Sequence, residues 1–233
     1  MPAIFLIALI VLARQAVQPS AVADLVVEDA WIDSSTYEPI VIRVRNPGQR
    51  IIVAWGVRAA VADSNGVVVS AGGGTDGFEV DVAHLANNPV LRPNDSYTIR
   101  LQSTRGGFTP VSVQAASVTY AIFDDNSAAG EERSIEMTFE RRARDAEAWQ
   151  FVERAVADAI QQHMVAEDVL RDVDAKISAA SKDIRNTSAG FQVPQRIRIA
   201  LRAPETARSF VDELSIEAGV RARNAANRSS RKR

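Results

Sequence analysis

The chain has 233 residues, a net charge of −2 and no cysteine. The lack of cysteine excludes disulfides, thiol nucleophiles and thiolate metal ligands. The near balance of 27 basic and 29 acidic residues argues against a specific nucleic-acid partner or an anionic surface as target.

The N-terminal segment has the pattern of an export signal. Residues 4–13 are a nearly unbroken apolar run that ends at Arg14, and Ala21-Val22-Ala23 supplies a small-x-small cleavage pattern. The run is shorter than the roughly 20 residues that cross a bilayer. The sequence predicts a signal peptide at 1–23 and a periplasmic or secreted protein with no transmembrane span after cleavage. A buried element at the start of the domain is the alternative.

Glycine and proline divide the rest of the chain into two parts. Ten of the twelve glycines lie between residues 24 and 130, whereas residues 131–189 contain neither glycine nor proline. Both residues mark turns and are unfavourable inside helices. The composition predicts short elements joined by turns, followed by long helix.

Residues 24–125 show the two-residue period of half-buried strands. Apolar residues alternate with polar ones in Ile40–Arg45 and Tyr97–Gln102, and further strands are expected at 51–62, 67–69, 78–82 and 111–123. Asn65-Gly66 predicts a hairpin turn. The expected fold is an antiparallel, immunoglobulin-like β-sandwich with Trp31 and Trp55 in its core.

Residues 126–189 are expected to be helical from about Ser127. A heptad pattern from Trp149 to Ile184 places apolar side chains on one seam. The favoured interpretation is two helices packed on their own domain, with a break at 141–145 where charge is dense. The alternative is one long helix whose 149–184 seam joins two copies in a homodimer.

The C-terminal residues divide into two segments. Ile197, Ile199 and Leu201 alternate with arginines and predict a late strand, and Phe210 to Leu214 predicts a short helix, both within 190–217. Residues 218–233 have six basic residues and no acid, which predicts a disordered basic tail.

The polar junction at 124–132 is a weak match to a calcium loop. Asp125, Ser127 and Glu136 fall at ligand offsets 1, 3 and 12, with Gly130 at offset 6 and Glu131 as a further oxygen donor. Offset 5 is an alanine and the entering element is expected to be a strand, so calcium is only a candidate cofactor. The competing interpretation is a helix N-terminus, capped by Asp125 or Ser127 and followed by acidic residues.

No catalytic signature is present. The sequence has no Gly-x-Ser-x-Gly, no His-Glu-x-x-His and no phosphate loop, and its two histidines lie in different halves. The sequence favours a non-enzymatic binding or scaffolding protein of the bacterial cell envelope, with an unknown envelope protein or polymer as partner. A carboxylate-based hydrolase or transferase near Asp124 is the alternative enzyme, and a homo-oligomeric structural protein is the third possibility.

Loops on a rigid sandwich commonly carry recognition. The expected interaction surface consists of the glycine-rich segment and a second loop, with the residues Gly72, Gly73, Gly74, Asp76 and Arg105.

The stretch 117–149 resembles a segment of uncharacterised exported bacterial β-sandwich proteins, in which an apolar strand runs into an Asp-rich turn and then a charged helix. The residues that carry the resemblance are Val118, Tyr120, Ile122, Phe123, Asp124, Asp125, Gly130, Glu131, Phe139, Arg141 and Arg142. The resemblance implies export and fold type, and no activity.

Overall fold

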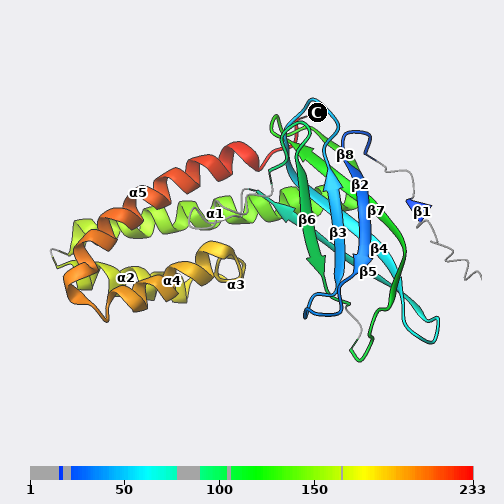
Figure 1. The fold of residues 1–233 in the computed structure, drawn as a ribbon. Coiled ribbons are helices and arrows are strands. Elements are labelled where there is room, and N and C mark those ends of the chain that lie inside the picture. The colour runs from blue at the N-terminus through cyan, green and yellow to red at the C-terminus, as the bar shows by residue number, and fades with distance from the viewer. Residues whose placement is uncertain (1–15, 18–21, 78–89, 104–105, 164, 233) are drawn as a thin grey trace, which may run out of the picture. The chain divides into compact units, whose positions relative to one another are not determined.

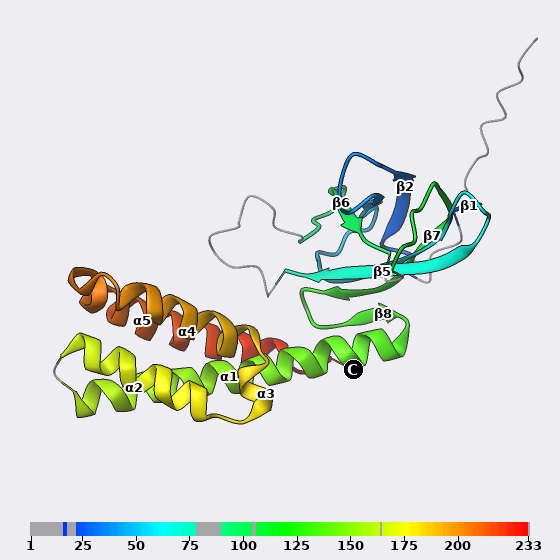
Figure 2. The same cartoon turned by 90° about the horizontal axis from the view of Figure 1, so that it is seen from below.

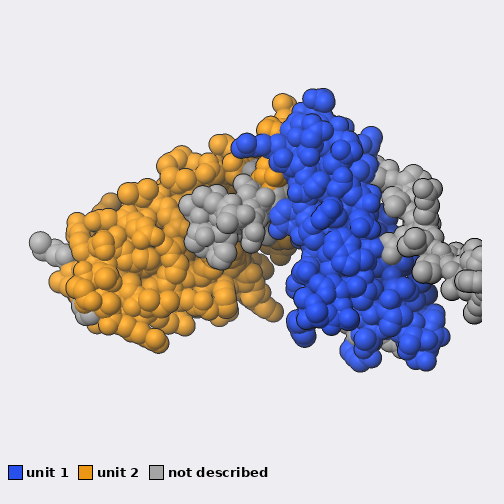
Figure 3. Space-filling view, in the orientation of Figure 1, with its two compact units in different colours: residues 1–49, 56–74, 91–119 blue, residues 50–55, 75–90, 120–233 orange. Residues whose placement is uncertain are grey.

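The computed structural model describes residues 16–17, 22–77, 90–103, 106–163 and 165–232. The chain forms two compact units, which Figure 3 colours separately. The β unit comprises residues 1–49, 56–74 and 91–119. The helical unit comprises residues 50–55, 75–90 and 120–233, and it includes short pieces of strand.

Within the described residues, eight strands form two antiparallel sheets, apart from one parallel pairing by the short β1 (Figure 1). One sheet has the order β2-β3-β6, and the other has the order β1-β7-β4-β5 with β8 also paired to β7. The strands are β1 (Ala16–Val17), β2 (Val26–Ile32), β3 (Ile40–Arg45), β4 (Ile52–Ala62), β5 (Val68–Asp76), β6 (Ser96–Leu101), β7 (Ser112–Phe123) and β8 (Ala128–Gly130).

The predicted strands at 40–45, 51–62, 97–102 and 111–123 are confirmed as β3, β4, β6 and β7. Exposure alternates along the whole of β6, whereas the first six residues of β4 are all buried. In β3 the side chains of Ile40, Ile42 and Val44 are buried and those of Arg43 and Arg45 are exposed, but Val41, on the same side as the arginines, is also buried. The hairpin at Asn65-Gly66 is also confirmed, because Gly66 has φ +79° and the amide of Asp63 donates to the carbonyl of Val67 across the turn. Trp55 is fully buried and Trp31 only partly.

The glycine-rich segment 72–77 is not a loop, and that prediction was wrong. Val68–Asp76 is the continuous strand β5. A Cβ on Gly73 would lie 2.5 Å from a terminal methyl of Leu101 in the other sheet. Glycine is therefore used here for close packing between sheets rather than for flexibility. The predicted strand at 78–82 and the residue Arg105 lie outside the described residues, as do residues 1–15 and 18–21 of the predicted signal peptide.

In the described part of the helical unit there are five helices, and α1, α2, α4 and α5 lie side by side in both views (Figure 1 and Figure 2). They are α1 (Glu132–Gln162), α2 (Ala166–Ala179), α3 (Lys182–Arg185), α4 (Ser188–Ala200) and α5 (Pro204–Arg228). None of the helices in the described residues has the length and apolar character needed to span a membrane.

The break in the helical half was placed wrongly at 141–145. Helix α1 is continuous through those residues and ends at Gln162, and the C-cap residue His163 has an extended backbone. The charged residues at 141–145 do not interrupt the helix. One of them, Arg142, forms a buried ion pair with Asp76. The helix also begins at Glu132, later than predicted, because residues 128–130 pair with β7 as β8.

The predicted seam lies inside the helical unit. Trp149, Val152, Val156, Leu170 and Val173 belong to one buried cluster with side chains of α4 and α5 of the same chain. The favoured interpretation, helices packed on their own domain, is confirmed in this respect. A second copy is not needed to cover these residues.

Two predictions at the C-terminus were wrong. The expected strand is helix α4, which buries Val193, Ile197 and Ala200 at helical spacing and leaves Ile199 65% exposed. The expected disordered tail is helical to Arg228, because Ala218 and Ala222 extend the buried stripe of α5. Beyond the helix, the amide of Lys232 donates to the carbonyl of Asn126.

Candidate functional site

A polar cavity of about 460 Å³ opens in the helical unit between α1 and the α3–α4 junction, and we call it the α1–α4 pocket. Ligand pockets of small molecules span about 300–1,000 Å³. Every lining residue is polar or charged: Arg141, Arg144, Asp145, Asp183, Asn186, Thr187, Ser188 and Gln192.

Helix α1 supplies the charged wall because Arg141, Arg144 and Asp145 are spaced i, i+3 and i+4 and so share a face. The opposite wall depends on the start of α4. There the Thr187 hydroxyl donates to the carbonyl of Ile184 (2.6 Å) and accepts from the amide of Gly190 (3.1 Å). This cap fixes the turn between α3 and α4.

Asp145 connects the two walls. Its Oδ1 accepts hydrogen bonds from the Ser188 amide (3.3 Å) and the Ser188 hydroxyl (3.2 Å) at the N-terminus of α4. Burial raises the pKa of the Asp145 carboxyl above its ordinary value of 3.8, and the hydrogen bonds from Ser188 and the charge of Arg141 oppose that increase.

The pH dependence of stability should reveal this group. Because the folded-state pKa is raised, the folded protein binds more protons than the unfolded chain from about pH 3.8 upward to the folded pKa. The Asp145 contribution to the free energy of unfolding therefore decreases as pH rises through that window. Asp145→Asn, which keeps an acceptor for Ser188, should remove this decrease.

Urea unfolding at several pH values compares the two proteins. The difference in free energy of unfolding, Asp145→Asn minus wild type, should increase with pH in the window and then level off. A difference that stays constant or decreases with pH would contradict a raised pKa of Asp145 in the folded protein.

Two opposite charges in the pocket have no ion-pair partner among the described residues. Among the residues that the structure describes, the exposed Arg144 guanidinium forms one hydrogen bond, from Nε to the carbonyl of Glu140 (3.5 Å). The exposed Asp183 carboxylate lies in the first turn of α3 and forms no ion pair with any described residue. Both groups line the same cavity without pairing with each other.

A buried ion pair adjoins the pocket through Arg141. Asp76, at the end of β5, accepts from Nε and Nη2 of Arg142 at 2.7 and 2.9 Å, and both side chains are almost completely buried. Arg141 Nη2 lies 3.6 Å from Asp76 Oδ2. The fork geometry holds α1 against the end of β5 within the helical unit.

The same region perturbs two further groups. Burial raises the pKa of the Tyr120 phenol, which a hydrogen bond with Thr138 lowers in part. Burial and the nearby charge of Arg142 lower the pKa of Arg228 on α5. These pKa shifts arise because the charged groups are buried together, and they do not by themselves indicate a catalytic site.

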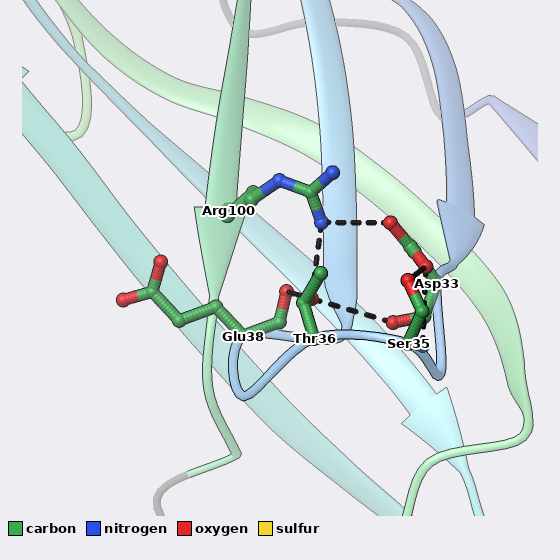
Figure 4. Close-up of polar contacts among 5 residues, drawn as sticks. All are labelled: Asp33, Ser35, Thr36, Glu38 and Arg100. Carbon is green, nitrogen blue, oxygen red and sulfur yellow. Dashed lines mark hydrogen bonds and ion pairs between the residues drawn. The ribbon is translucent and has the colours of Figure 1, made fainter.

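The β unit contains a separate polar cluster in the β2–β3 connection (Figure 4). Arg100 Nη1 donates to Asp33 Oδ2 (3.0 Å) and to Thr36 Oγ1 (3.1 Å), and the Ser35 hydroxyl donates to Asp33 Oδ1 (2.5 Å). The hydrogen bond from Ser35 is the main cause of the lowered pKa of Asp33. Asp33 is partly buried and the other groups are exposed. Their polar atoms bond to one another, so the cluster stabilises the turn between β2 and β3.

The four calcium candidates are not gathered around one point. Asp125 accepts from the amide (2.9 Å) and hydroxyl (2.6 Å) of Ser127 and so closes the β7–β8 turn. Glu131 accepts from the hydroxyl of Ser134 (3.0 Å), and Glu136 is exposed on α1. No group of three or more acidic or histidine side chains in the described part of the chain is placed to hold a metal.

The alternative for that junction, a helix cap by Asp125 or Ser127, was wrong. These residues cap the turn before β8, where Asn126 has φ +65°, and the N-cap residue of α1 is Glu131. Glu132 lies in the first turn, as expected for the positive end of the helix dipole.

Four of the five predicted interaction residues lie in the described part of the chain. Gly72, Gly73 and Gly74 lie within β5, and Asp76 is the buried partner of Arg142. Asp124 is exposed in the β7–β8 turn and does not line the pocket.

None of the residues that line the pocket was predicted from the sequence as a site residue. A signal was present in the i, i+3, i+4 spacing of Arg141, Arg144 and Asp145, and in Thr187-Ser188 before an apolar run. The first segment was interpreted as a helix break, and the second was included in the helical region expected at 126–189.

No protein-family model matches this chain, and neither a curated protein nor a solved structure matches it. The resemblance of residues 117–149 to exported β-sandwich proteins therefore stays a prediction, and the α1–α4 pocket is interpreted from its geometry alone.

Proposed function

We propose that the protein is an exported, non-enzymatic binding protein of the bacterial cell envelope, and that its helical unit binds a small polar solute in the α1–α4 pocket. The observation that carries this proposal is a cavity of about 460 Å³ lined entirely by polar and charged side chains. Export is proposed from the apolar run and the Ala21–Ala23 pattern.

The lining favours a hydrophilic ligand. Guanidinium, carboxylate, amide and hydroxyl groups supply both donors and acceptors, and no lining side chain is aliphatic or aromatic. An apolar ligand would dehydrate these groups without replacing their hydrogen bonds to water. We further propose an immunoglobulin-like sandwich for the β unit, which the close approach of Gly73 to Leu101 supports.

Asp145 favours a second candidate function. A carboxyl whose pKa is raised by burial, beside two arginines in a cavity, has the properties of a general acid. A hydrolase or transferase would then use Asp145, and not the exposed Asp124. Chemical conversion of a bound solute, lost in Asp145→Asn while binding persists, would distinguish this candidate from simple binding.

A solute screen tests the proposed function. We expect at least one member of a library of amino acids, short peptides, sugars and organic acids to raise the melting temperature of the purified chain, because a ligand that binds the folded state stabilises it. Arg144→Gln should reduce the shift.

Arg133→Gln is the matched control, because Arg133 is exposed on the same helix and does not line the pocket. Its ligand-induced shift should equal that of wild type. A library without any effect, or equal shifts in the Arg144 variant and wild type, would refute the proposed site.

A further inference from the structure

We infer that the α1–α4 pocket takes a small zwitterion, a molecule with one ammonium group and one carboxylate, of the size of an amino acid or dipeptide. The inference rests on the proposed function and names the ligand class of the same site. It is carried by two opposite charges that line one cavity and do not pair with each other.

These two charges are Arg144 and Asp183. They come from α1 and α3, and neither forms an ion pair with any other described residue. The other two charged residues of the lining have roles within the protein. Asp145 accepts two hydrogen bonds from Ser188, and Arg141 approaches the buried Asp76.

Each unused charge fits one end of a zwitterion. A guanidinium binds a carboxylate through two parallel N–H donors. An ammonium group has three donors and no acceptor, and the Asp183 carboxylate and the side-chain carbonyl of Asn186 can accept from it. Exposed opposite charges in one cavity therefore offer complementary partners to both termini of a dipeptide.

The balanced lining disfavours ligands with one sign of charge. A phosphate would meet the carboxylates of Asp145 and Asp183, and a polyamine would meet the guanidiniums of Arg141 and Arg144. A neutral sugar could use the amides and hydroxyls, but it would dehydrate Arg144 and Asp183 without offering them a charge.

Isothermal titration of the purified chain with alanyl-alanine tests the inference. We expect saturable binding of this dipeptide. N-acetyl-alanyl-alanine, which lacks the ammonium group, and alanyl-alanine amide, which lacks the carboxylate, should each bind about 10-fold or more weakly, since each loses a charge-assisted contact.

Two variants assign the contacts. Arg144→Gln should weaken the dipeptide and remove the preference for the dipeptide over its amide. Asp183→Asn should remove the preference for the dipeptide over its acetylated form. Arg133→Gln and Asp158→Asn change exposed charges of α1 outside the pocket and should leave both preferences intact.

The outcomes separate this inference from the proposed function. Equal affinity for the dipeptide and its two capped forms overturns the inference. Binding of glucose or inorganic phosphate without binding of the dipeptide also overturns it, and leaves a polar-solute pocket in place. Absence of binding by the dipeptide, glucose and phosphate overturns the inference as well, whereas the proposed function fails if the wider library has no effect or if Arg144→Gln leaves the library's effect unchanged.

Discussion

Asp76→Asn is expected to lower the free energy of unfolding by about 3–5 kcal/mol, the cost typical of removing one partner from a buried ion pair. Asp76 and Arg142 are 3% and 4% exposed, and two hydrogen bonds join them. An asparagine can accept one of these bonds, but it removes the negative charge that Asp76 places beside the buried guanidinium. Urea unfolding followed by the helical circular dichroism signal measures the change.

Two further variants separate the lost charge from other effects. Asp158→Asn makes the same chemical change at an exposed position of α1 and should alter stability by less than about 0.5 kcal/mol. The double variant Asp76→Leu, Arg142→Met removes both charges and should recover much of the loss. If Asp76→Asn were as stable as Asp158→Asn, the ion pair would have no structural importance.

Gly190→Ala is expected to destabilise the protein by about 1–3 kcal/mol, the range seen when a methyl group is forced into a packed site. A Cβ on Gly190 would lie 2.7 Å from Cα of Arg185 and would also collide with the backbone of Ile184. Backbone atoms cannot rotate away, so the α3–α4 turn must shift. Thermal or urea unfolding measures the effect.

Gly219→Ala is the matched control, because Gly219 also lies inside a helix. Its Cβ would meet Glu153 Oε1 at 3.2 Å and Arg223 Nη1 at 3.4 Å, and both atoms end flexible side chains. Alanine is favoured over glycine in helices by up to about 1 kcal/mol, so this variant should be neutral or stabilising. Equal losses in the two variants would show that the close contact at Gly190 is not responsible.

The glycine-rich strand β5 shows where local interpretation fails. Three consecutive glycines indicate a turn when only the sequence is known. In the structure the position of Gly73 is set by Leu101, which is 28 positions away in the chain and belongs to the other sheet. A contact between sheets cannot be inferred from the glycines themselves.

The C-terminal helices show a related failure. Ile197, Ile199 and Leu201 fit a strand period, and Val193, Ile197 and Ala200 fit a helix period, so the sequence allowed both. The segment is helical because a helix buries Val193, Ile197 and Ala200 against the apolar surface of the other helices. Ala218 and Ala222 were read as part of a tail because small side chains give a weak periodic signal.

The sequence by itself determined the features that depend on neighbouring residues: alternating exposure in β6, the Asn65-Gly66 turn and the helical character of most residues after Gly130. Backbone conformation and side-chain direction are local, so a few residues suffice to indicate them. Only the tertiary structure decided that Asp76 pairs with Arg142 and that Arg144 and Asp183 line one cavity. Those relations depend on how distant segments pack, which no local pattern specifies.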